Sequence, residues 1–385
     1  MNLRLSALSL ALAIFCMTLD ASDIYNHSLG VDFRPQWVIP TNDFIKNSDI
    51  NSALGGDLKY SFSFSPDSFY GRNYPAARQG IGLGYTSIAN GTKLGKPINL
   101  YLFQNVPIAK LSSRLSLIYE WNFGLSTNWN PYDPDKNPDN GAIGSKTNAY
   151  INLGLLLRYR LNRNVDITAG IDGTHYSNGN TTIPNAGANF AGIKVGLSYT
   201  FDSQREVPLP VDKDKFERGM GYDLTVYGAA RRRAFFSDSS HEYLYARGLF
   251  GVLGLNFAPM YGFSRYFRAG VSLDAQYDES ANILNHRVEG TPDDDMKFYR
   301  PPFKEQIAVG LSLRAELVMP IFSINVGIGR NIICDGKDTD IFYQTLTLKA
   351  YLWRNAFLNI GYQLNDFHEP NNLMLGFGYS FGMKR

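Results

Sequence analysis

Cysteine is almost missing from this chain, which has only Cys16 and Cys334. Cys16 lies in an apolar N-terminal segment, so an exported mature chain would keep Cys334 alone. A single cysteine excludes an internal disulfide framework. Groups of cysteine and histidine with metal-ligand spacing are also missing, so we expect no metal centre.

Long hydrophobic runs are missing as well. Beyond residue 21, no apolar run approaches the ~18 residues that a transmembrane helix needs. Charge of one sign is not in excess either, because the formal net charge is +2. A nearly neutral chain gives no electrostatic reason to expect a nucleic-acid partner.

The N-terminus has the pattern of a secretory signal peptide over residues 1–21. Arg4 supplies a positive start, an apolar stretch follows from Leu5 to Met17, and small residues follow at Ala21 and Ser22. The rest of the chain is rich in Tyr (24), Phe (25) and Gly (36). Such a composition in an exported chain without disulfides favours an outer-membrane β-barrel of a Gram-negative bacterium.

Alternation of apolar and polar residues is the dominant periodicity. In the stretch 165–177, VDITAGIDGTHYS, the odd positions begin with Val165, Ile167, Ala169 and Ile171. The even positions carry mainly polar or small side chains. A period of two predicts a strand with one apolar face, and its repetition along the whole chain predicts an all-β, antiparallel membrane barrel.

About sixteen such strands are expected. Their starts lie near residues 28, 53, 77, 97, 113, 147, 165, 189, 220, 242, 264, 305, 321, 339, 356 and 372. Tight turns and long polar connections alternate along the chain, as in barrels with short periplasmic turns and long external loops. The stretch 67–76 is an exception, because it is long where a short turn is expected.

A polar segment at 203–219 divides the chain into two units of about eight strands, 22–202 and 220–385. A weak internal repeat relates them: both contain a strand, a tight Arg-Asn turn, a strand, a Pro-Asn loop and a last strand ending Tyr-x-Phe. The pattern is compatible with one barrel of sixteen strands or two of eight.

The stretch 174–189, THYSNGNTTIPNAGAN, contains the candidate site. His175 and Ser177 have odd numbers, so strand phase places both on the apolar, lipid-facing side, and Asn189 begins the next strand on the same side. A serine hydroxyl needs a base within reach, and the base needs an orienting group. The alternative is that these polar residues lie outside the hydrocarbon region, contact water and have no catalytic role.

This motif, followed by the final strand KVGLSYTF, resembles the lipid A 3-O-deacylase (PagL) family of acyloxyacyl hydrolase-like outer-membrane barrels. The resemblance is best over 147–202. It implies an esterase of the outer membrane that removes an acyl chain from lipid A of lipopolysaccharide, among outer-membrane lipids and without a cofactor. Carried over by position, Ser177 is the nucleophile and His175 the general base.

The resemblance also implies an oxyanion hole from Asn185, with backbone N–H groups near Gly179 and Asn180. The sequence departs from the family at Asn189, where the better-known members carry an acid. An amide can orient a histidine but supplies no negative charge to the imidazolium.

The second unit lacks this constellation. Alignment of the repeats places Asp366 at the position of His175 and His368 at that of Ser177. We therefore expect the second unit to be without catalytic residues. Two non-catalytic interpretations of the whole chain stay open: a channel, favoured by the large number of strands, and a structural barrel that retains the family fold.

Overall fold

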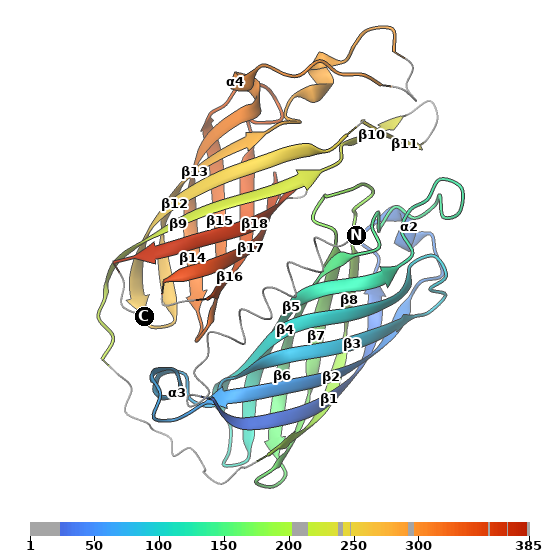
Figure 1. Cartoon of the computed structure of the whole chain (residues 1–385). Helices are drawn as coiled ribbons and strands as arrows, with labels where there is room; N and C mark the ends of the chain where they lie inside the picture. Colours follow the sequence, from blue (N-terminus) through green and yellow to red (C-terminus); the bar gives the residue numbers. More distant parts are fainter. Residues whose placement is uncertain are drawn as a thin grey trace. The chain divides into compact units, whose positions relative to one another are not determined.

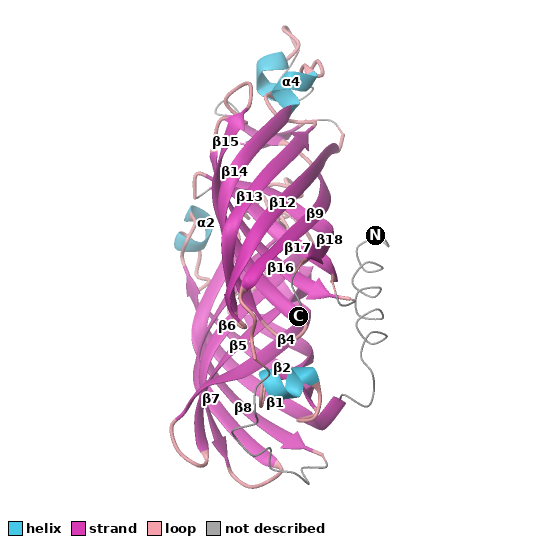
Figure 2. Cartoon of the chain, turned by 90° about the vertical axis from the view of Figure 1, so that its left-hand side faces the viewer, coloured by secondary structure: helices cyan, strands magenta, loops and turns pink. Residues whose placement is uncertain are grey.

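The computed structural model describes residues 24–201, 215–237, 242–246, 248–291, 296–352, 355–367 and 369–382. The expected signal peptide, most of the segment 203–219 and His368 lie outside these ranges. The described chain forms two closed antiparallel barrels (Figures 1 and 2). None of the helices in the described ranges has the length and apolar character needed to cross a bilayer.

The first barrel has eight strands, each paired with its neighbours in sequence. They are β1 (Ile24–Ile39), β2 (Ser52–Phe64), β3 (Arg78–Ile88), β4 (Gly95–Lys110), β5 (Leu115–Trp129), β6 (Asn148–Arg160), β7 (Val165–Ser177) and β8 (Ala188–Thr200). Pairing of β1 with β8 closes the sheet. Two short helices, α2 (Asp43–Lys46) and α3 (Phe69–Asn73), lie in the connections. Helix α3 occupies the long turn that breaks the alternation of turn lengths.

The second barrel also has eight strands and is closed by pairing of its first strand with its last. They are β9 (Gly219–Arg231), β12 (Phe250–Ser264), β13 (Phe267–Asp278), β14 (Ile307–Val318), β15 (Phe322–Ile333), β16 (Phe342–Tyr351), β17 (Ala356–Asn365) and β18 (Glu369–Phe381). The connections contain the hairpin β10 (Ala234–Ser237) and β11 (Glu242–Tyr245), the 3₁₀ turn η2 (Ile283–His286) and helix α4 (Phe303–Gln306). Because the first and last strands of each unit pair with each other, the chain forms two barrels of eight strands and not one barrel of sixteen.

One expected strand start is wrong. The strand expected near residue 242 begins at Phe250, and residues 242–245 pair instead with Ala234–Ser237 in a separate hairpin. The stretch EYLY has strong β-propensity, so its composition predicts a strand without saying which partner it pairs with.

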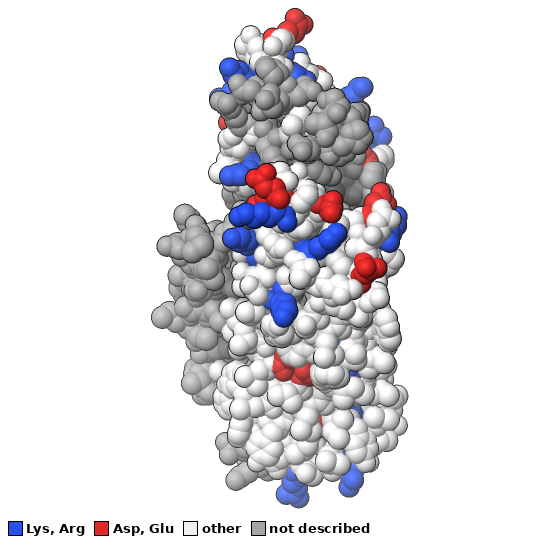
Figure 3. Space-filling view, turned by 90° about the vertical axis from the view of Figure 1, so that its right-hand side faces the viewer, with Lys and Arg blue, Asp and Glu red and all other residues white. Residues whose placement is uncertain are grey.

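The outer walls are apolar, as the alternation predicts. On β7 and β8 the outward positions include Ile171, which is 64% exposed, and Ile193. On the face drawn in Figure 3, a broad, largely uncharged area separates charged side chains gathered above it from Lys and Arg side chains below it. This distribution is typical of a wall that faces lipid between two polar interfaces.

The interior of the first barrel is filled with side chains. Toward the long loops an aromatic and aliphatic core joins strand residues such as Tyr150, Tyr176 and Phe190 to loop residues such as Ile45 and Ala142. Small eight-stranded barrels leave just enough interior space for such packing.

Further along the interior, Glu120 bridges two lysines. Its carboxylate lies 2.7 Å from Lys59 Nζ and 2.9 Å from Lys194 Nζ, and Lys59 also contacts Asp32 at 2.8 Å. Lys194 and Asp172, which the alternation placed on the inner face, are both buried in this polar interior.

We expect Glu120→Ala to destabilise the first barrel by about 3 to 5 kcal/mol, because it leaves two buried cations without their shared partner. Urea unfolding in detergent, followed by the heat-dependent shift of the folded band on electrophoresis, measures this loss. Asp139→Ala is the matched control, since Asp139 forms an exposed pair with Lys93 and should change stability by no more than about 1 kcal/mol. Equal losses in the two variants would contradict the structural role assigned to Glu120.

Candidate active site

Strands β7 and β8 place His175 and Asn189 directly opposite each other. The two residues are register partners in the antiparallel ladder, and Asn189 is in turn the partner of Ile39 on β1. His175 continues the outward series that includes Ile171, so its ring lies on the outer wall near the long-loop end of the barrel. Directly opposed side chains on one face of a sheet are close enough to bond.

The imidazole and the amide form a short hydrogen bond. His175 Nδ1 lies 2.6 Å from Asn189 Oδ1. An amide oxygen can only accept, so Nδ1 carries the ring proton and donates it. Nε2 is then left with its lone pair, which is the protonation state that a general base requires.

Asn189 is anchored at its other end as well. Its Nδ2 group donates to Thr41 Oγ1 at 2.8 Å. Thr41 lies in the connection between β1 and β2, and sequence reasoning assigned it no role. Nothing in the motif points to it, because only closure of the barrel brings β1 beside β8.

Ser177 is the last residue of β7 and lies two positions beyond His175. Residues two apart on a strand project from the same face, with Cβ atoms roughly 7 Å apart. Within the described part of the chain, the Ser177 hydroxyl and the His175 ring do not bond to each other. Catalytic hydrogen bonds are often long in free enzymes and shorten only when substrate is bound.

The connection between β7 and β8 contains the three residues expected to form an oxyanion hole. Asn185 Oδ1 accepts a hydrogen bond from the backbone N–H of Asn178 at 2.8 Å. Asn185 Nδ2 is buried, with no hydrogen-bond partner among the described residues. Gly179 and Asn180 both have left-handed backbone conformations, with φ of +64° and +59°. Asn185 therefore has an amide donor available beside Ser177's neighbour, Asn178.

Gly187 also belongs to this site, although sequence reasoning gave it no role. Its φ is +76°, and a Cβ atom there would lie 3.1 Å from His175 Cε1 and 3.0 Å from Tyr176 O. A side chain at this position would be strained by the left-handed backbone and would press on the imidazole, so both features favour glycine. The feature of the sequence that could have pointed to Gly187 is its position in the motif, two residues before Asn189.

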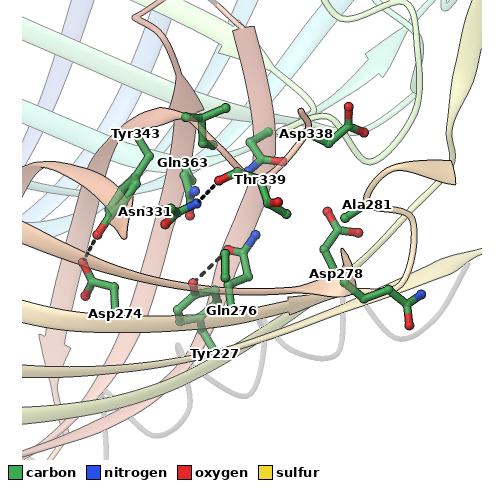
Figure 4. A pocket seen from close by; sticks show the side chains of 14 residues that line it. Tyr227, Asp274, Gln276, Asp278, Ala281, Asn331, Asp338, Thr339, Tyr343 and Gln363 are labelled. Atoms are coloured by element: carbon green, nitrogen blue, oxygen red, sulfur yellow. Dashed lines mark hydrogen bonds between the residues drawn. The ribbon is translucent and has the colours of Figure 1, made fainter. Parts of the chain in front are cut away.

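The second barrel has a different polar interior. A small cavity inside it is lined by residues that bond to one another, including Tyr343 with Asp274 at 2.7 Å and Tyr227 with Gln276 at 3.0 Å (Figure 4). Asp366, which the repeat aligns with His175, lies in a turn and accepts a hydrogen bond from Phe342 N. Within the described ranges, no group of three or more His, Cys, Asp or Glu residues is arranged to hold a metal ion.

Family models match both barrels. The model described as lipid A 3-O-deacylase (PagL) matches residues 106–198, which include every residue of the β7–β8 site. The model described as acyloxyacyl hydrolase, C-terminal domain, matches residues 220–384. Each barrel therefore contains a match to a model of the PagL type. Together with the two closed antiparallel barrels, these matches make the chain a β-barrel protein of the outer membrane.

Solved structures of several outer-membrane proteins resemble the chain. The outer membrane enzyme PagL shares 13% identity over 44% of this chain and 97% of its own, with a TM-score of 0.27. The siderophore receptor PirA from Acinetobacter baumannii shares 8% identity over 88% of this chain and 68% of its own, with a TM-score of 0.25. The FrpB iron transporter from Neisseria meningitidis shares 9% identity over 94% and 71%, with a TM-score of 0.23. No curated protein matches the sequence significantly.

Proposed function

We propose that this protein is an esterase that removes an ester-linked hydroxyacyl chain from lipid A, using Ser177 as nucleophile and His175 as general base. One observation carries the proposal: the hydrogen bond from His175 Nδ1 to Asn189 Oδ1, which lies on the lipid-facing wall next to Ser177. An oriented imidazole is costly on a wall exposed to lipid and has no role in closing the barrel. The match of the PagL model to the same residues supports the substrate.

The position of the site suits an ester of a membrane lipid. The ester bonds of lipid A lie where the sugar headgroup meets the acyl chains. His175 lies at the end of the apolar wall of β7, two outward positions beyond Ile171. An acyl chain can therefore run down the wall while its ester reaches the catalytic pair, and the lipid need not leave the membrane.

The chemistry needs two steps. In the first, His175 Nε2 takes the Ser177 proton as the hydroxyl oxygen attacks the ester carbonyl, and the imidazolium then protonates the departing sugar alkoxide. In the second, His175 removes a proton from water, which attacks the acyl-serine, and the imidazolium returns this proton to the departing Ser177 oxygen, so that a fatty acid is released and both residues are regenerated. In both steps the carbonyl oxygen becomes negative, and Asn185 Nδ2 is the donor we assign to it, with backbone N–H groups near Gly179 and Asn180.

Asn189 keeps the correct tautomer but gives no charge. In a serine protease, a change from Asp to Asn lowered kcat about 10⁴-fold, mainly through the wrong tautomer. Here the amide oxygen faces Nδ1, so that part of the penalty is avoided. What is lost is the attraction between a carboxylate and the imidazolium.

The lipid A profile of a Gram-negative host tests the activity. We expect expression of the wild-type protein to produce lipid A lighter by one hydroxyacyl chain, and expression of Ser177→Ala to leave the profile as it is in the empty host. Mass spectrometry of extracted lipid A gives both results, and folded barrel levels are matched by heat-modifiable electrophoresis. An unchanged profile with several lipopolysaccharide types would contradict the proposed activity.

Gly187→Ala provides a test within the site that leaves every catalytic side chain in place. The methyl group meets the His175 ring, and the left-handed backbone adds about 1 to 2 kcal/mol of strain. We expect kcat for acyl release to fall about tenfold or more. Gly173→Ala is the matched control, because its Cβ meets nothing closer than Phe190 O at 3.9 Å. Full activity in Gly187→Ala would show that the ring position does not matter.

A further inference from the structure

Thr41 contacts the site from outside the motif. Its hydroxyl oxygen accepts a hydrogen bond from Asn189 Nδ2 at 2.8 Å, although 148 positions separate the two residues in sequence. The bond continues a line that runs from His175 Nδ1 through the Asn189 amide to Thr41. Among the described residues, Thr41 forms no hydrogen bond with His175 or Ser177, so it acts on the pair only through Asn189.

The backbone beside Thr41 is firmly held. Asn42, the next residue, is the N-cap of α2, and its Oδ1 accepts from Ile45 N at 3.0 Å. Ile45 is 3% exposed and packs in the core at the barrel mouth. Asn42 Nδ2 donates to Gly187 O at 3.0 Å. Thr41 is therefore fixed between the end of β1 and a helix anchored in the core.

A second anchor matters more for an amide than for a carboxylate. The two ends of a carboxylate are equivalent, and either can accept from His175 Nδ1. An amide has one productive orientation of two, because Nδ2 facing Nδ1 would place the ring proton on Nε2. The imidazole could then no longer take a proton from Ser177. A bond that holds the Nδ2 end in place keeps the amide in its productive orientation.

We propose that Thr41 is a positioning residue for His175, acting through Asn189, and that this role depends on the amide at position 189. The proposal rests on the esterase function proposed above. It explains how the site works without the acid of the better-known family members. The connection between β1 and β2 supplies an anchor for the amide that orients the base.

A double-mutant cycle tests this inference with purified protein in detergent micelles and lipid A as substrate. We expect Thr41→Val to lower kcat about tenfold at an unchanged KM, the factor carried by one ordinary hydrogen bond. Thr41→Ser, which keeps the hydroxyl, should stay within about twofold of wild type. Asn189→Asp alone should raise kcat about tenfold or more, because a carboxylate stabilises the imidazolium.

In the Asn189→Asp background, Thr41→Val should change kcat by less than about twofold, the tolerance for uncoupled sites. The same tenfold loss in both backgrounds would reduce Thr41 to a general structural contact and overturn the proposal. No loss in either background would overturn it too.

The tautomer of His175 gives a readout that does not need activity. Nitrogen-15 chemical shifts of the histidine rings, with the His175 signals assigned by their loss in His175→Ala, report which nitrogen carries the proton. We expect the Nδ1–H form in wild type and a mixture of both forms in Thr41→Val. An unchanged tautomer in Thr41→Val would overturn the positioning role. If wild type released no acyl chain, the esterase function would fail, while the tautomer would still decide the role of Thr41.

Discussion

Ser177→Ala and His175→Ala are each expected to lower the rate of acyl release by about 10⁴- to 10⁶-fold. Among the described residues, the Ser177 hydroxyl forms no hydrogen bond with another base, and the lone pair of Nε2 has no other role on a lipid-facing wall. When two residues act in the same catalytic step, removing either one abolishes the rate enhancement that depends on both. The double variant should therefore be no slower than either single variant.

Initial rates of fatty-acid release from lipid A in mixed micelles measure this prediction. Both side chains belong to the outward series of β7, although Ser177 is only 8% exposed. Both variants should therefore unfold close to the urea concentration of the wild type. Thr168→Ala, on the same strand but on its inner series, is a suitable control for the strand itself. A rate in Ser177→Ala within about tenfold of wild type would exclude Ser177 as the nucleophile.

Asn185→Ala should lower kcat by about 10²- to 10³-fold, the loss typical of removing one oxyanion donor, with little change in KM. The physical reason lies in the two ends of its amide. Oδ1 accepts from Asn178 N at 2.8 Å, while Nδ2 is buried without a partner among the described residues. A buried donor with nothing to bond costs free energy, and negative charge on the substrate oxygen would give it a partner.

Asn185→Asp separates these two roles. The carboxylate still accepts from Asn178 N, so the loop keeps its bond, but the donor is gone. If Nδ2 stabilises the oxyanion, the aspartate variant should be at least as slow as the alanine variant. Recovery of activity in Asn185→Asp would instead mean that Asn185 only holds the loop.

The alternation of apolar and polar residues was enough to predict most of the strands. Residues 165–177 were expected to form one strand, and β7 spans those residues, because one apolar face against lipid fixes the phase of every side chain. The same reasoning failed near residue 242. There a short, strand-forming stretch pairs with Ala234–Ser237 in a hairpin, and propensity does not name a partner.

Strand phase also predicted that His175 and Asn189 lie on the same, outward side of the sheet, because the side is found by counting along β7 and β8. It did not predict that Thr41 and Asn42 belong to the site, or that Nδ2 of Asn185 is buried. Thr41 and Asn42 reach the site because β1 closes against β8 and because Ile45 anchors α2 in the core. The choice between one barrel and two rested on which strands close each sheet, and both halves carry the same alternation.

Covalent trapping of the acyl-enzyme tests the central claim most directly. The protein is incubated with a lipid-like phosphonate ester that reacts with activated serines, then digested with trypsin and analysed by mass spectrometry. The peptide 164–194 contains a single serine, Ser177. The expected result is one adduct on this serine, abolished in His175→Ala. An adduct on a different peptide, or release of acyl chains that continues while Ser177 stays unlabelled, would contradict the account.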